Sequence, residues 1–510
     1  MGSGARLLER LLGHAPDSVA IVRPGNPSVK YGGLAAESAR LARRLRGGRR
    51  TLAGARVGLL LSPGPSFVTA LWAVWRAGGV AVPLSATHTA PELTHALRTA
   101  APEATVVERD PGAETIAAAA CGAWLGRRID FTVFSRAAAA APTAPDDDDA
   151  GDGDPGAASA DDDPAVMLFT SGTTGKPKGV VLSHAGVEAT LNALHEAWRW
   201  QKDDRLLHAL PLYHTHGLIV ALLGALWAGA SIRFAAFDAP ATWDLLAEAS
   251  VFMAVPTMYV RLLEAFAATT PERRAGWAAG ARGVRLFTSG SAALPATILA
   301  AFAEATGQTI LERYGMTEIG MALSNPYDGP RIAGSVGTPL PGVQVDIVDD
   351  SGHPAVDGQA GELRVRSPQL FVGYHGDPTG TAASYDDAGR FRTGDTGMRG
   401  TDGYIRLLGR TSVDILKSGG YKLSALEIED ILRGHPAIAD VAVIGVPDPV
   451  WGDCVTACVV PRSDADAPTL DDLRAFAREA LAPYKLPRAL RVLAALPRTA
   501  MGKVQKSLLK

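Results

Sequence analysis

Short apolar segments alternate with helical segments along the first 135 residues, and this alternation limits the possible fold more than any other feature. The segment ARVGLLL (55–61) predicts a strand, residues 67–76 predict a helix, and GVAVPL (79–84) predicts the next strand. Such a rhythm is typical of βαβ units on a mostly parallel sheet. Because 510 residues exceed what one compact core accommodates, we expect an α/β protein with at least two domains.

The texture of the chain changes again after this region. Residues 136–164 carry an Ala-rich stretch and many aspartates, which predict a solvated acidic loop. The α/β alternation then resumes, whereas residues 334–409 hold short strands between Gly, Pro and Asp turns. We therefore predict a large N-terminal domain over 1–409, with α/β subdomains and a small β-rich subdomain, and a small α+β C-terminal domain over 410–510.

Charge and cysteine usage argue against nucleic acid or an anionic membrane as partner and against an oxidising compartment. A net charge of -3 gives no electrostatic reason to expect nucleic acid or an anionic membrane as partner. The chain has three cysteines, an odd number without zinc-like spacing, which argues against an oxidising compartment. We find no apolar signal-peptide core and no apolar stretch of the roughly 20 residues that span a membrane. A cytoplasmic location is expected, and the sequence does not specify the oligomeric state.

A glycine-rich loop is the strongest motif. It reads TSGTTGKPKG over residues 170–179 and alternates hydroxyls, glycine-freed amides and two lysines. Such a loop can surround an oligophosphate with N–H groups, hydroxyls and cations. A Walker A loop is excluded because Pro177 follows Lys176 where Ser or Thr is needed to hold magnesium. A flexible surface hairpin is the alternative.

Five motifs in order resemble the adenylate-forming superfamily of acyl-CoA synthetases, peptide-synthetase adenylation domains and firefly-type luciferases. The resemblance covers nearly the whole chain. The motifs are TSGTTGKPKG (170–179), YGMTE (314–318), RTGD (392–395), LGR (408–410) and PRTAMGK (497–503). The resemblance implies ATP, coenzyme A and Mg²⁺ as ligands, with no covalent enzyme nucleophile. Catalysis would then consist of positioning and charge stabilisation.

The resemblance also implies roles for single residues. Lys503 would bridge the carboxylate and the α-phosphate, Thr317 would contact the α-phosphate, and Asp395 would accept the ribose hydroxyls. Glu318 would hold Mg²⁺ with the hydroxyls of Thr173 and Thr174. The other implied nucleotide-binding residues are Thr170, Ser171, Gly172, Gly175, Lys176, Lys178, Ser289, Gly290, Ser291, Tyr314, Gly315, Met316 and Arg410. Taken singly, Asp395 could stabilise a turn, Glu318 could cap a helix, and Lys503 could be merely solvated.

In the resembled family the C-terminal domain rotates between adenylation and thiol transfer. The hinge would fall within residues 410–414. There TSVD stands in place of the two adjacent acids that commonly follow the arginine, and we choose Ser412 as the pivot. The loop KSGGYK would form the pantetheine tunnel through Ser418, Gly419, Gly420, Tyr421 and Lys422. A plain turn before a helix at 425–433 is the alternative.

Three segments (331–342, 409–429 and 443–452) look most similar to malonyl-CoA synthetases, which implies malonate or methylmalonate as substrate. By the same resemblance His214 lines the acyl channel, while Thr215 and Met316 set the room for an α-substituent. Arg261 lies off the apolar stripe of its helix, so it could simply pair with Glu264. The resemblance implies that this helix borders the acyl pocket, where a guanidinium would suit a second carboxylate. Either Ser289 or Arg331 would assist Arg261.

Other functions remain open from the sequence. The His-x-His pair of His214 and His216 could suggest a metal site, but no third ligand is apparent nearby. A short or aromatic monocarboxylic acid could be the substrate. A module that loads a carrier protein is less favoured because we expect no carrier domain after Lys510. A light-emitting oxygenase or a nucleotide sensor without catalysis would share the fold.

Overall fold

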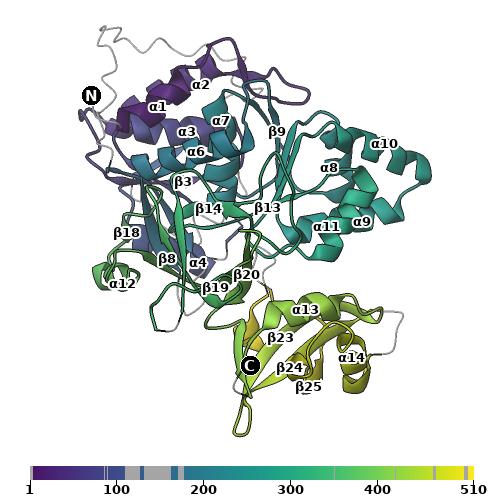
Figure 1. Ribbon diagram of the computed structural model, residues 1–510. Helices are drawn as coiled ribbons and strands as arrows, with labels where there is room; N and C mark the ends of the chain where they lie inside the picture. Colours follow the sequence, from purple (N-terminus) through teal and green to yellow (C-terminus); the bar gives the residue numbers. More distant parts are fainter. Residues whose placement is uncertain are drawn as a thin grey trace.

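The computed structural model of the chain describes residues 4–85, 87–88, 90–108, 127–130, 162–170, 177–349, 351–419, 421–462, 467–498 and 504–510. A large body of sheets and helices is followed by a smaller lobe formed by the last hundred residues (Figure 1). The predicted α/β fold is confirmed.

The largest sheet has nine strands, and six neighbouring strands, from β13 to β1, run parallel. In spatial order the strands are β15 (Thr338–Pro339), β14 (Gly320–Ser324), β13 (Leu311–Met316), β12 (Leu286–Ser289), β11 (Val251–Ala254), β9 (Arg205–His208), β10 (Ser231–Phe234), β1 (Val19–Ile21) and β2 (Val29–Lys30). Its helices are α6 (His184–Trp198), the π-helix η1 (His216–Leu223), α7 (Gly224–Ala228), α8 (Ala239–Leu246), α9 (Pro256–Ala268), α10 (Pro271–Arg282) and α11 (Ala296–Thr306). Helices α6 and α7 lie on one side of β9 and β13, and α8 to α11 lie on the other (Figure 1).

A seven-stranded sheet carries the strands predicted near the N-terminus. Its order is β18 (Gly373–Tyr374), β8 (Lys178–Ser183), β7 (Pro164–Thr170), β4 (Val80–Pro83), β3 (Arg56–Leu60), β5 (Ala104–Val107) and β6 (Arg127–Asp130). The helices of this region are α1 (Gly4–Leu12), α2 (Tyr31–Arg46), α3 (Pro65–Arg76) and α4 (Ala90–Ala100). Pro65 opens α3, where its missing N–H costs no helical hydrogen bond. The strand–helix–strand unit predicted over 55–84 is therefore confirmed.

The β-rich segment forms an antiparallel four-stranded sheet of β16 (Gln344–Val348), β17 (Ala360–Arg366), β19 (Phe391–Arg399) and β20 (Ile405–Arg410). The short helix α12 (Pro378–Ala383) lies between β18 and β19 in the chain. Strands β15 and β18 come from the same part of the sequence but join the two larger sheets. The β-rich segment thus ties the three sheets of the large body together.

The last hundred residues build a sheet of their own. It contains β22 (Tyr421–Ser424), β21 (Ile415–Ser418), β24 (Gly452–Pro461), β23 (Ile438–Asp448) and β25 (Ala489–Val492). Its helices are α13 (Ala425–Arg433), α14 (Leu470–Ala477) and the 3₁₀ turns η2 (Pro483–Lys485) and η3 (Lys506–Leu509). Two hydrophobic clusters here consist only of residues after position 415. Cys458 is buried in one of them, whereas Cys454 is only partly buried.

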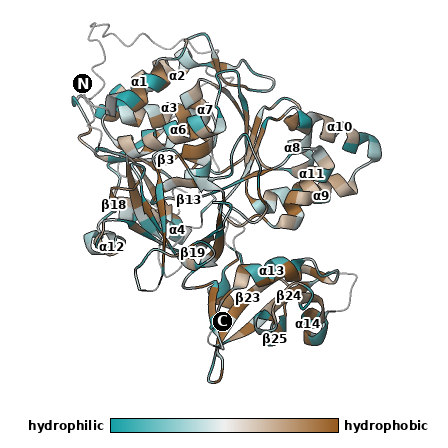
Figure 2. Cartoon of the chain, viewed as in Figure 1, coloured by the Kyte–Doolittle hydropathy of each residue, from teal (hydrophilic) through white to brown (hydrophobic). Residues whose placement is uncertain are grey.

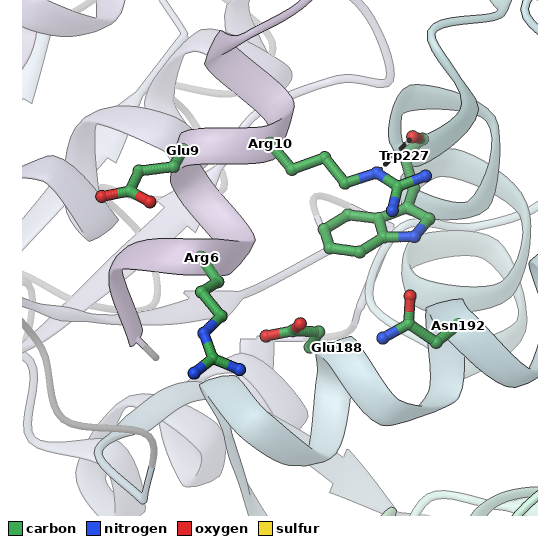
Figure 3. A pocket seen from close by; sticks show the side chains of 6 residues that line it. All are labelled: Arg6, Glu9, Arg10, Glu188, Asn192 and Trp227. Atoms are coloured by element: carbon green, nitrogen blue, oxygen red, sulfur yellow. Dashed lines mark hydrogen bonds between the residues drawn. The ribbon is translucent and has the colours of Figure 1, made fainter. Parts of the chain in front are cut away.

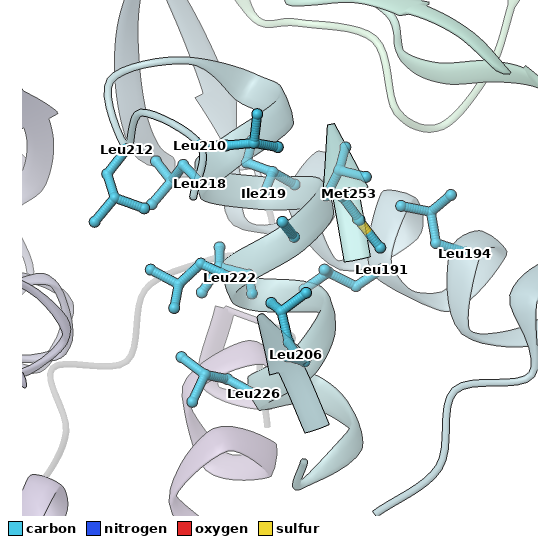
Figure 4. Close-up of a cluster of buried hydrophobic side chains, with 14 of the residues drawn as sticks. Leu191, Leu194, Leu206, Leu210, Leu212, Leu218, Ile219, Leu222, Leu226 and Met253 are labelled. Carbon is cyan, nitrogen blue, oxygen red and sulfur yellow. The ribbon is translucent and has the colours of Figure 1, made fainter. Parts of the chain in front are cut away.

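The main core lies where η1 crosses the nine-stranded sheet. Leu218, Ile219 and Leu222 of η1 pack among leucines of α6 and the neighbouring strands (Figure 4). Apolar residues fill the sheets of both lobes, and polar ones gather on the outer helix faces (Figure 2). None of the helices in the described parts of the chain combines the length and apolar character needed to cross a bilayer.

Candidate active site

The carboxyl ends of β9, β11, β12 and β13 meet at one edge of the nine-stranded sheet, because these strands are parallel. Loops that follow parallel strands at this edge are the usual place for a ligand in α/β proteins. Three predicted segments lie there. They are the 214–216 segment after β9, the 289–291 segment at the end of β12, and the 316–318 segment at the end of β13.

A threonine pair joins two of these loops. Thr215 Oγ1 donates a hydrogen bond to Thr317 Oγ1 at 3.2 Å. Next to Thr215, the ring of His214 packs on Tyr213, which in turn contacts His88 from the loop after β4. Burial, with the nearby His88 charge, lowers the pKa of His214 to about 4. His214 is therefore a neutral ring at pH 7 and suits a channel lining better than an acid–base role.

Glu318 is a buried carboxylate at the meeting point of two sheets. It is 6% exposed. Its Oε1 accepts a hydrogen bond from the Tyr374 hydroxyl at 3.0 Å, and its backbone carbonyl accepts one from the Phe371 amide at 2.8 Å. Burial raises the pKa of Glu318 above its ordinary value. Strand β18 therefore fixes the carboxylate while leaving it further lone pairs for a cation.

Asp395 joins the four-stranded sheet to the same site. The Tyr314 hydroxyl donates to Asp395 Oδ2 at 2.6 Å, and Arg410 Nε lies 3.2 Å from Asp395 Oδ1. Asp395 and Arg410 are also register partners on β19 and β20. The three predicted nucleotide residues Tyr314, Asp395 and Arg410 are thus in direct contact.

The glycine-rich loop is described only at its two ends. Thr170 ends β7 and Lys178 begins β8, whereas Ser171, Gly172, Thr173, Thr174, Gly175, Lys176 and the C-terminal Lys503 lie outside the described residues. Lys178 Nζ is 3.1 Å from Asp377 Oδ2 and 4.6 Å from the centre of the Tyr374 ring. Lys178, at the C-terminal end of the loop, therefore lies beside the tyrosine that donates to Glu318.

The turn after β12 is tight and strained. Ser291 has a φ of 71°, a left-handed conformation that a serine adopts only when its surroundings impose it. Ser289 is fully buried, and its Oγ has no hydrogen-bond partner among the described residues. A side chain at Gly290 would collide with Arg313, since a Cβ there would lie 2.3 Å from the arginine Cζ. Glycine is therefore required at 290 for the packing seen here.

The two arginines chosen for a second carboxylate lie elsewhere. Arg261 is on the exposed side of α9, with its guanidinium 5.0 Å from the centre of the Phe237 ring. Arg331 donates to the backbone carbonyls of Thr309 and Tyr327. Thr309 precedes β13, roughly 20 Å from the strand's other end at about 3.3 Å per residue. The structure therefore does not bring Arg331 to Thr317, and it does not bury Arg261.

The predicted coenzyme A loop is a hairpin of the small lobe. Ser418 is 2% exposed and its Oγ has no partner in the described part of the chain. Gly419 has a φ of 59° and packs against Trp451, while the exposed Tyr421 stacks on Tyr484 at 4.3 Å. The position of Gly420 and the side chain of Lys422 lie outside the described residues.

Sequence reasoning missed four residues that the structure places at or near these sites: Tyr374, Arg313, His216 as a pocket residue, and Lys506. Arg313 immediately precedes YGMTE, so a charged residue inside an otherwise apolar strand was a usable signal. Tyr374 reaches its position through the pairing of β18 with β8, and Lys506 contacts Asp414 from the end of the chain. Neither contact produces a pattern in the neighbouring sequence.

A surface hollow of about 480 Å³ lies away from these motifs, between α1, α6 and α7 (Figure 3). Arg10 stacks there on Trp227 at 4.2 Å, and none of the predicted site residues lines it. Within the residues that the structure describes, no three metal-ligating side chains converge, so the His214–His216 pair lacks a third ligand.

Comparison with known proteins identifies relatives of the whole chain. Residues 8–375 match the AMP-binding enzyme family, and residues 427–503 match the AMP-binding enzyme C-terminal domain. The chain is 41% identical to the mitochondrial malonate–CoA ligase of Bos taurus, with 88% of this chain and 80% of the relative covered.

Two solved structures are also similar. ATP-bound MatB from Rhodopseudomonas palustris gives a TM-score of 0.86 at 35% identity, covering 100% of this chain and 98% of MatB. A malonyl-CoA ligase complex with methylmalonyl-CoA and AMP gives 0.66 at 39% identity, covering 95% and 97%.

Proposed function

The chain belongs to the AMP-binding enzyme family, and we propose from this premise that it joins malonate or methylmalonate to coenzyme A. The reaction consumes ATP and releases AMP and pyrophosphate through an acyl-adenylate. The observation that carries the proposal is the approach of Glu318, which follows Thr317 at the end of β13, to Asp395 of the four-stranded sheet, in a chain 41% identical to a malonate–CoA ligase.

In the first half-reaction a substrate carboxylate attacks the α-phosphate of ATP. The 170–179 loop surrounds the phosphates, Thr317 contacts the α-phosphate, and Lys503 steadies the two anions as a point cation. Asp395 accepts the ribose hydroxyls, since Tyr314 and Arg410 already orient its two oxygens. Ser289, Gly290 and Ser291 pass beside the adenine.

Mg²⁺ fits the site as a proposed cofactor. Glu318 offers a carboxylate whose orientation is set by Tyr374, and the hydroxyls of Thr173 and Thr174 are the other expected ligands. Magnesium in phosphate sites takes one or two carboxylates together with phosphate oxygens. When bound, it would neutralise charge on the departing pyrophosphate.

In the second half-reaction a thiolate attacks the adenylate carbonyl and AMP leaves. We propose domains of 1–409 and 410–510 that rotate about residues 410–414, near Ser412, so that the 418–422 hairpin replaces Lys503 at the site. The TM-score is higher with ATP-bound MatB (0.86) than with the product complex (0.66), although the sequence identity is lower. This difference in overall structure supports a small domain whose placement changes between the two steps. Cytoplasmic location remains part of the proposal and rests on cysteine usage.

The deciding experiment is coenzyme A-dependent AMP release with malonate, methylmalonate, acetate and benzoate side by side. We expect the two diacids to give kcat/KM at least 100-fold above the monoacids. Comparable rates with acetate or benzoate would contradict the diacid assignment. Transfer of the acyl group to a carrier protein in place of coenzyme A would contradict coenzyme A as the acyl acceptor.

A further inference from the structure

Asp414 lies at the end of the proposed hinge, and both of its carboxylate oxygens accept hydrogen bonds. Oδ2 accepts one from the backbone amide of Arg410 at 3.0 Å. Oδ1 accepts one from Lys506 Nζ at 2.6 Å, from a residue 92 positions further along the chain. One carboxylate therefore joins the strand that carries Arg410 to η3, the last turn of the chain.

On one side of this bridge, Arg410 is held by the four-stranded sheet. Its Nη1 donates to the Thr393 carbonyl at 2.8 Å, and its Nε lies 3.2 Å from Asp395 Oδ1. The following amide, that of Thr411, donates to the Gly394 carbonyl at 2.9 Å. The guanidinium thus contacts the carboxylate that we assign to the ribose, so a displacement of Arg410 would also displace Asp395.

The other side of the bridge belongs to the small lobe. The Asp414 carbonyl accepts a hydrogen bond from the Ala425 amide, at the start of α13, at 2.8 Å. Lys506 Nζ also lies 2.6 Å from Oε1 of Glu429, a residue of α13 that is 5% exposed. Because a buried ammonium is costly to separate from its carboxylates, this cluster fixes the Asp414 side chain relative to α13.

The backbone is shaped to allow this close approach. The Asp414 amide donates to the Arg410 carbonyl at 2.8 Å, so the turn folds the carboxylate back onto the Arg410 amide. Gly409 has a φ of 123°, and a Cβ there would lie 2.4 Å from Asp414 Cβ. Only glycine at 409 therefore leaves room for the Asp414 side chain.

A simple turn is the competing explanation, because an aspartate often closes a turn by accepting from a nearby backbone amide. Closing the turn requires one oxygen of Asp414 and no cation. The second oxygen instead binds Lys506, which belongs to a different lobe from Arg410. This second contact is the feature that a simple turn does not explain.

We propose that Asp414 is a positioning residue, which holds Arg410, and through it Asp395, in the arrangement that adenylation requires. The role rests on the proposed function, because it takes Asp395 as the acceptor of the ribose hydroxyls. The TM-score of this arrangement is 0.86 with ATP-bound MatB and 0.66 with the product complex. The Asp414 bridge is thus expected to serve the first half-reaction more than thiol transfer.

The test is Asp414→Ala, assayed separately for each half-reaction. Malonate-dependent ATP–pyrophosphate exchange should fall roughly 10- to 100-fold in kcat/KM for ATP, because a small displacement of a positioning contact has effects of this size. Transfer from supplied malonyl-adenylate to coenzyme A should stay within about threefold of the wild type. Equal losses in the two half-reactions, or no loss in adenylation, would overturn the proposal.

Two further variants distinguish positioning from a general disturbance of the hairpin. Asp414→Asn keeps an acceptor for the Arg410 amide but offers no charge to Lys506, so its adenylation rate should lie between those of the wild type and Asp414→Ala. Asp402→Ala removes the partly exposed Asp402–Arg406 pair at the turn before β20 and should leave both half-reactions unchanged. If Asp402→Ala loses adenylation as Asp414→Ala does, Asp414 has no special role.

Circular dichroism shows whether the variants are folded at the assay temperature. Asp414→Ala leaves Lys506 paired with Glu429, so we expect cooperative unfolding. Should it prove unfolded, the ratio of the two half-reactions in Asp414→Asn decides the question in the same way. If the wild type forms no adenylate from either diacid, the proposed function fails. If the wild type performs both half-reactions with malonate and Asp414→Ala matches it, only the role of Asp414 fails.

Discussion

Among the described residues, each lobe buries one cationic side chain, and the surroundings of the two differ. Lys506, 8% exposed, lies 2.6 Å from Asp414 Oδ1 and 2.6 Å from Glu429 Oε1. Arg313, 3% exposed, has an edge with no partner among the described residues. Burial alone would lower the pKa of Lys506, but Glu429 and Asp414 raise it above the ordinary value. A buried charge with protein partners supports the fold, whereas one without them is available to a ligand.

The Lys506 cluster also narrows the proposed hinge. Asp414 ends the 410–414 segment, Glu429 belongs to α13, and Lys506 belongs to η3 at the end of the chain. Glu429 Oε1 accepts a further hydrogen bond from the Val443 amide at 2.7 Å. Because these groups hold Asp414 to the small lobe, we expect rotation to occur at residues 411–413.

The largest expected effect is on stability. Lys506→Met leaves Asp414 and Glu429 buried without a cation, so the free energy of unfolding should fall by about 3–5 kcal/mol. Arg313→Leu removes an uncompensated charge and should change it by less than about 1 kcal/mol or increase it. Denaturant unfolding followed by circular dichroism measures both.

Lys485→Met is the matched control, because it breaks the partly exposed pair with Glu427 in the same lobe. Such pairs contribute about 0–1 kcal/mol. Equal losses in Lys506→Met and Lys485→Met would contradict the distinction drawn between a structural cation and a surface one.

A second effect concerns the pH dependence of stability and comes from Glu312, which precedes Arg313 on β13. Its folded pKa of about 8 exceeds the ordinary 4.5, so the unfolded chain ionises first as pH rises. Wild-type stability should therefore decline between pH 4.5 and about 8 by on the order of a few kcal/mol, and level off above. Glu312→Gln should lack this decline, while the exposed Glu304→Gln should follow the wild type. Parallel curves for all three proteins would show that Glu312 is not buried neutral.

Much of the site was predictable because motifs follow strands. Parallel strands bring their carboxyl ends to one edge, so the 214–216, 289–291 and 314–318 segments had to converge once the βα rhythm was identified. The family and the ligase activity inferred from the motifs are confirmed. The single-residue roles, including those of Lys503 and Arg410, stay predictions.

The missed residues share a physical reason. Tyr374 reaches Glu318 only because β18 pairs with β8 from a distant part of the chain. Arg261 was chosen because its helix borders the acyl pocket in the resembled family, but its side chain is exposed on α9. Burial of a single arginine inside a strand depends on what packs over it, and η1 and Gly290 are not local to β13.

A smaller effect should come from Gly290→Ala. The added Cβ would lie within 2.3 Å of Arg313 Cζ and displace the guanidinium, so kcat/KM for malonate should fall roughly 10- to 100-fold, or about 1.4–2.7 kcal/mol. The loss should vanish when Gly290→Ala is combined with Arg313→Leu, because the two changes act on one contact. Additive losses in this double-mutant cycle would mean that the glycine serves the nucleotide instead.

The smallest effect concerns Glu318, which lies between the two extremes because a side-chain donor holds one of its oxygens. Tyr374→Phe removes the hydroxyl that donates to Oε1 at 3.0 Å and leaves the ring and its contact with Lys178 in place. A lost hydrogen bond of this kind costs about 1 kcal/mol, so the Mg²⁺ concentration for half-maximal AMP release should rise about fivefold. Tyr385→Phe, which alters a neighbouring ring of the same aromatic cluster, should leave that concentration unchanged. If both variants need the same Mg²⁺ concentration as the wild type for half-maximal AMP release, Glu318 does not bind the metal. Its buried carboxyl group would then support the fold, as Lys506 does.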